Sequence, residues 1–116
     1  MDNNNDNISI IEDFIDAQTD YTTSKTRYEG LRNDYRVASE HAARLQELHG
    51  RHPESKAIAV NLQHSLEWKE AIRAKLENAK VEINYSTAAF NAAISQAQEA
   101  GIIRQTGSEW WQVELK

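Results

Sequence analysis

Residues 10–45, IIEDFIDAQTDYTTSKTRYEGLRNDYRVASEHAARL, carry an apolar repeat that decides the fold. Apolar or small side chains recur at alternating spacings of four and three residues, and the spacing never slips. This period is typical of a helix that buries one narrow face, a seam, against another helix. The seam consists of Ile10, Phe14, Ala17, Tyr21, Ser24, Tyr28, Leu31, Tyr35, Ala38, Ala42 and Leu45.

A second stretch with the same spacing follows after a short interruption. Its seam consists of Ile58, Leu62, Ser65, Lys69, Ile72, Leu76, Ala79, Ile83, Ser86, Phe90, Ala93, Ala97 and Ala100. Two helices with complementary seams and a short connection fold back on each other. The sequence therefore predicts a mainly α fold, a long antiparallel two-helix coiled-coil hairpin over residues 9–101.

Signals at the helix ends set the predicted boundaries at 9–49 and 53–100. Ser9 with Glu12 has capping-box spacing, and residues 1–8 before it are polar and predicted to be disordered. Gly50 stands where a terminating glycine belongs, and Pro53 suits a first helical turn. Gly101 is the expected terminator of the second helix.

The position of the loop sets which seam residues lie opposite each other. Residue numbers of facing pairs should sum to about 107, so that Ala17 faces Phe90 and Ala42 faces Ser65. Large side chains then meet small ones, as interdigitating packing prefers. Lys69 is the exception, and its amine is expected to extend outward to water.

The second helix also carries an apolar stripe nearly opposite its seam. The stripe consists of Val60, Ala71, Ala74, Val81, Tyr85, Ala88 and Ala92, and Leu66, Trp68 and Ile94 flank the seam. A helix that is apolar on two sides is usually buried on two sides. A second copy of this helix, the C-terminal residues or a foreign protein could cover the stripe. The first of these predicts a homodimer that forms a four-helix bundle; the alternative is that alanine is simply a good helix former on an exposed face.

Residues 102–116 are predicted to form a small C-terminal β-element. Trp111 begins an alternation of apolar and polar residues, and Gly107 can turn the chain between two strands. An isolated hairpin is barely stable, so it should pack on its own helices, pair with a second copy or add to a partner's sheet. Trp110 lies on the other face from Trp111 and is the better candidate for an external contact.

The segment AGIIRQTGSEWWQVEL, residues 100–115, resembles the last third of a winged-helix domain. The resemblance implies a recognition helix running into a wing, and hence a nucleic-acid-binding regulator. However, residues 90–101 contain no arginine or lysine, whereas phosphate contacts need them. Nucleic acid is therefore not the expected partner.

Charge and composition narrow the function classes further. Residues 1–20 hold six acids and no base, residues 21–80 hold eleven bases and eight acids, and the net charge is −5. No cysteine is present, which excludes disulfides and thiolate chemistry. No apolar run approaches the roughly 20 residues of a membrane span, so no membrane contact is expected, and the protein is predicted to be cytoplasmic.

Neither a catalytic constellation nor a metal or cofactor motif stands out. The four histidines gather toward the loop, where a metal site is conceivable but solvated side chains are the plainer interpretation. The sequence therefore predicts a non-enzymatic protein-binding module, such as an adaptor, assembly factor or inhibitor from a bacterium or phage, with an oligomeric structural or packaging subunit as an alternative. The candidate protein-binding residues are Trp68, Ala74, Val81, Tyr85, Trp110 and Trp111.

Overall fold

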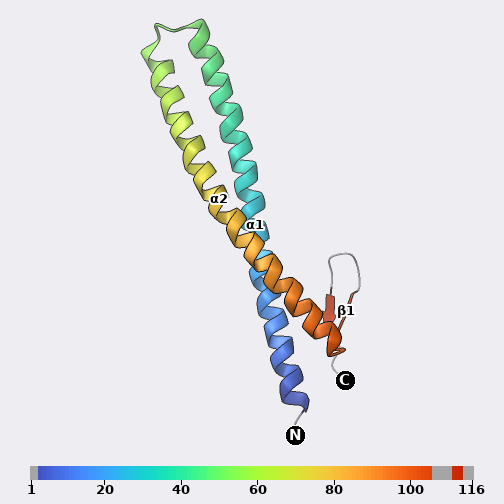
Figure 1. Cartoon of the computed structure of the whole chain (residues 1–116). Coiled ribbons are helices and arrows are strands. Elements are labelled where there is room, and N and C mark those ends of the chain that lie inside the picture. Colours follow the sequence, from blue (N-terminus) through green and yellow to red (C-terminus); the bar gives the residue numbers. More distant parts are fainter. Residues whose placement is uncertain (1–2, 106–110, 114–116) are drawn as a thin grey trace. The chain divides into compact units, whose positions relative to one another are not determined.

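Two long helices and two short strands make up the computed structural model, which describes residues 3–105 and 111–113 (Figure 1). Its elements are α1 (Asn3–Arg51), α2 (Lys56–Glu99), β1 (Ile103–Gln105) and β2 (Trp111–Val113). The chain divides into a loop unit, Lys25–Val81, and a terminal unit, Met1–Ser24 with Glu82–Lys116. Each unit contains a segment of α1 and a segment of α2.

The predicted seams are buried along both helices. All eleven seam positions of α1 are buried or half-buried, and so are all those of α2 except Ala100. Between them, most positions are exposed and polar. The unbroken alternation of four and three residues therefore identified the packed face of each helix, and the predicted pairing of two long helices is confirmed.

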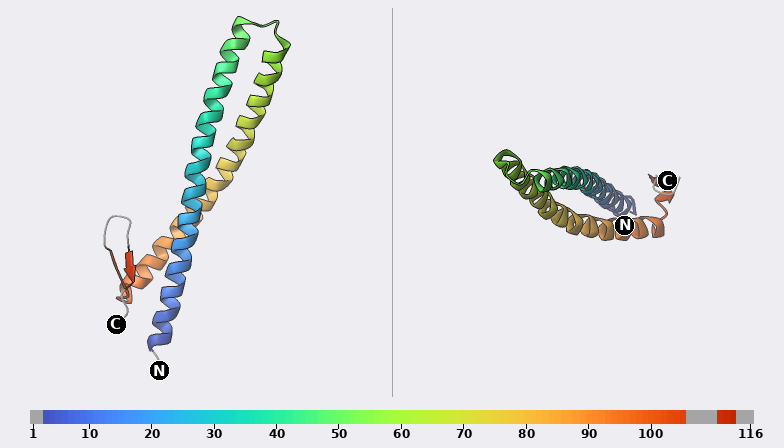
Figure 2. Two further views of the ribbon diagram at one scale, coloured as in Figure 1. Left: turned by 180° about the vertical axis from the view of Figure 1, so that it is seen from behind. Right: turned by 90° about the horizontal axis from the view of Figure 1, so that it is seen from above.

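In the loop unit the two helix segments run antiparallel, side by side in both views (Figure 2). The Nδ1 atom of His41 lies 2.9 Å from the hydroxyl of Ser65, one residue away from the expected Ala42–Ser65 pair. Lys69 is half-buried, and its amine lies 5.9 Å from the centre of the Tyr35 ring. A cation over an aromatic face keeps its charge while its aliphatic stem covers the seam. The amine therefore lies beside a ring of α1, a contact that the sequence did not predict.

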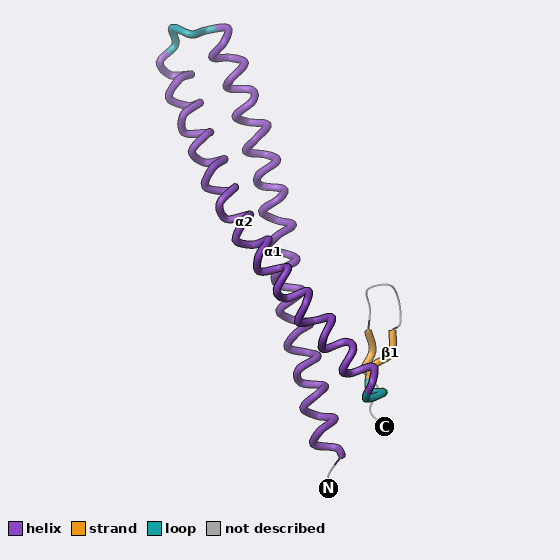
Figure 3. Tube along the Cα trace, in the orientation of Figure 1, coloured by secondary structure: helices purple, strands orange, loops and turns teal. Residues whose placement is uncertain are grey.

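Four residues, His52–Ser55, connect the helices (Figure 3). The Ser55 hydroxyl accepts a hydrogen bond from the Ile58 amide at 3.3 Å, which makes Ser55 the N-cap of α2. The expected boundaries are therefore wrong by a few residues. Gly50 lies inside α1 with an ordinary φ, and Pro53 precedes α2, because a serine that binds a free helix amide is the stronger start signal.

Gly101 ends α2 as predicted, with φ = 71°. The Ile102 amide donates to the Ala97 carbonyl at 3.1 Å, and the Gly101 amide donates to the Gln98 carbonyl at 3.0 Å. These two bonds form a Schellman motif, which satisfies carbonyls that the helix end leaves open. Ile102 and Ala97, the two positions that usually touch in this motif, belong to the same buried cluster.

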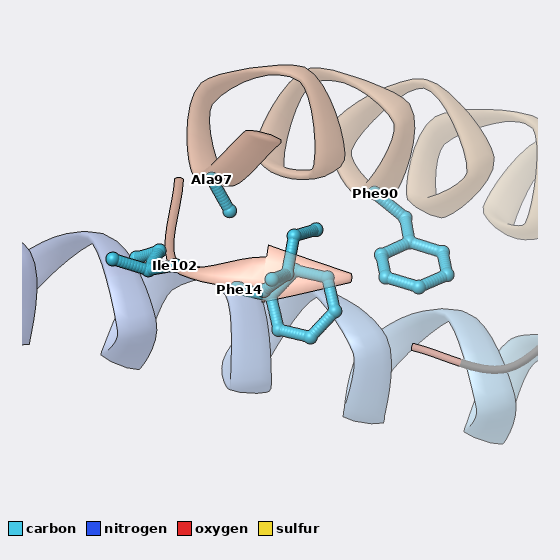
Figure 4. Close-up of a cluster of buried hydrophobic side chains, with 5 residues drawn as sticks. Phe14, Phe90, Ala97 and Ile102 are labelled. Atoms are coloured by element: carbon cyan, nitrogen blue, oxygen red, sulfur yellow. The ribbon is translucent and has the colours of Figure 1, made fainter. Parts of the chain in front are cut away.

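The core of the terminal unit joins residues from near both ends of the chain (Figure 4). Phe14 of α1 is 1% exposed, and its ring centre lies 5.6 Å from that of Phe90 of α2. The Tyr21 ring stacks with the Phe90 ring at 5.2 Å, so Phe90 lies between Phe14 and Tyr21, opposite Ala17, as the register predicts. Ile102 and Ile103 are buried in this cluster, and the start of β1 therefore packs on the chain's own helices.

β1 and β2 pair antiparallel, with Ile103 opposite Val113 and Gln105 opposite Trp111. The turn expected around Gly107 lies outside the described residues, so the complete hairpin stays a prediction. At the other end, α1 begins at Asn3, and the disorder predicted for residues 1–8 differs from the structure over residues 3–8. Asparagine and aspartate are only weakly unfavourable in a helix, which allows an established helix to extend into such a segment.

Candidate protein-binding surface

The stripe opposite the seam of α2 is exposed in the single chain. We call Val60, Ala71, Ala74, Val81, Tyr85, Ala88 and Ala92 the outer face of α2. Tyr85 is 78% exposed, Val81 60% and Val60 51%, and the four alanines are exposed as well. Since β1 packs into the core of the terminal unit through Ile103, the described part of the C-terminal element buries an apolar side chain there and not on the outer face.

Within the loop unit, Trp68 stands at the edge of the seam and is 45% exposed. Its ring meets the His41 ring edge-on, with 6.4 Å between the ring centres and 77° between the planes. His41 is itself held by the Ser65 hydroxyl. One side of the indole is thus fixed while the rest faces solvent, which is how aromatic anchors at binding surfaces are commonly presented.

The remaining candidate tryptophans belong to the C-terminal element. Trp111 is the first residue of β2 and pairs with Gln105. Trp110 lies outside the described residues, so the suggestion that it makes an external contact remains a prediction from sequence. Of the six candidate residues, the structure places Trp68, Ala74, Val81 and Tyr85 on exposed surface of α2.

The seam pattern did not single out the exposed apolar side chains of α1. Ile8, Ile15, Val37 and Leu48 are each between 41% and 50% exposed. They fall outside the seam and are separated from one another by two or more turns of the helix, and single apolar residues on a surface are ordinary. The outer face of α2 differs from them because, from Ala71 to Ala92, its members follow one another every three or four residues, with Asn78 between Ala74 and Val81.

Charged groups near these surfaces are paired locally along each helix. Glu70 accepts hydrogen bonds from the Arg73 guanidinium at 2.9 and 3.0 Å, and this pairing lowers the pKa of the Glu70 carboxyl. Arg36 lies 3.0 Å from Glu40 one turn away. A shallow hollow of about 280 Å³ on α1 is lined by the polar side chains of Glu29, Arg32, Asn33 and Arg36.

The histidines near the loop do not assemble a metal site in the part of the chain that the structure describes. No group of three or more histidine or acidic side chains there lies close enough together to hold an ion. His41, one of the four histidines toward the loop, forms a hydrogen bond with the Ser65 hydroxyl. Among the same residues, neither helix is long and apolar enough to cross a membrane.

No family model, curated protein or solved structure matches this chain at a significant level.

Proposed function

We propose that this chain is a non-enzymatic protein-binding module that works as an adaptor, assembly factor or inhibitor. The observation that supports this proposal is the outer face of α2, which leaves Tyr85, Val81 and Val60 exposed beside a row of alanines. Small residues let two helices approach closely, and a large side chain among them fills the hollows on a facing helix. Burial of such a face is favourable by about 25 cal/mol for each Å² of apolar surface.

Self-association through the outer face is the binding mode that we propose first. The face has the length and spacing that a second helix of the same kind would match. The C-terminal strands are proposed to complete a β-hairpin whose tryptophans extend the binding surface beyond α2.

Substitution on the outer face tests this function. The double variant Ala74→Glu and Val81→Glu places two carboxylates where a partner helix would pack, and both positions belong to the loop unit. We expect the wild-type chain to have twice the monomer mass by multi-angle light scattering, and the variant to have the monomer mass with unchanged helix content by circular dichroism. A matched control is Val37→Glu, which changes an exposed valine of α1 and should leave the mass unchanged.

Each alternative function has its own experimental signature. A mass of many copies would support an oligomeric structural subunit and contradict a dimeric module. Binding of nucleic acid that weakens steeply with salt would support the regulator, since phosphate contacts release counterions. A wild-type chain that is monomeric at every concentration, with the double variant indistinguishable from it, would overturn self-association through the outer face.

A further inference from the structure

We draw no further inference here: the strongest candidate, the outer face of α2 around Val60, Ala74 and Val81 in the loop unit, belongs to the surface already described, and nothing in the structure shows what covers it.

Discussion

Replacement of Phe14 by alanine should selectively loosen the terminal unit. Phe14 is 1% exposed and packs against Phe90, Ile102 and Ile103, so the substitution leaves a cavity lined by apolar groups. Buried Phe→Ala changes cost about 3–5 kcal/mol, which includes the loss of the ring pair with Phe90. We expect about 3 kcal/mol, since an end of the structure can partly close the cavity, and a melting temperature lowered by roughly 12–24 °C.

The assay should report the stability of each unit as well as the free energy of unfolding of the whole chain. Urea denaturation gives the free energy of unfolding, and hydrogen exchange reports on single amides. The Ile102 amide, bonded to the Ala97 carbonyl, should exchange faster in the Phe14→Ala variant, while the amide of Ile72 in the loop unit keeps most of its protection. Ile15→Ala is the matched control, because its side chain is the next along α1 but is 47% exposed. If both variants lose the same stability, Phe14 is not part of a packed core and the reasoning is refuted.

Further predictions concern the backbone and one ion pair. Gly101→Ala should lose about 1–2 kcal/mol in urea denaturation, because φ = 71° is strained for any residue with a Cβ. Gly30→Ala should instead gain up to about 1 kcal/mol, since Gly30 lies inside α1 with nothing within 4 Å of the added carbon; a loss there would contradict the open surroundings. Arg73 holds the pKa of Glu70 below its ordinary 4.5, so this pair stabilises the fold above that pH and the contribution is lost as pH falls through the lowered pKa. Glu70→Gln should therefore lower the urea midpoint at neutral pH and match the wild type in strong acid, and a difference that persists in acid would show another cause.

The packed faces of the helices followed from sequence because a single physical rule governs them. A seam residue must recur every three or four positions to stay against the facing helix, and any slip would have moved Phe90 away from Ala17. The contacts of Phe90 with Phe14 and Tyr21 confirm that register. Exposure of the outer face in the single chain could not be predicted in the same way, because the C-terminal residues were one of three possible covers for it.

The helix ends were harder to predict because several residues compete for each role. Pro53 and Ser55 lie close together, and either residue could have marked the start of the second helix. The structure favours Ser55, whose hydroxyl satisfies the Ile58 amide. The burial of Ile102 and Ile103 depends on the Schellman motif, which turns the chain back onto the helices. A repeat pattern gives no information about that turn, so the surface on which β1 packs could be stated only as one of three alternatives.

The clustering of Phe14 with Ile102 and Ile103 has a consequence for the order in which the protein assembles. Residues near the turn contact residues that are close to them in sequence, so bringing the two helices together there costs little loop-closure entropy. Phe14, by contrast, cannot pack until Phe90, Ile102 and Ile103 have emerged from the ribosome. We therefore expect the two helices of a nascent chain to pair first beside the turn and then progressively away from it. The acidic residues 1–20 should be the last part of the chain to become resistant to proteases.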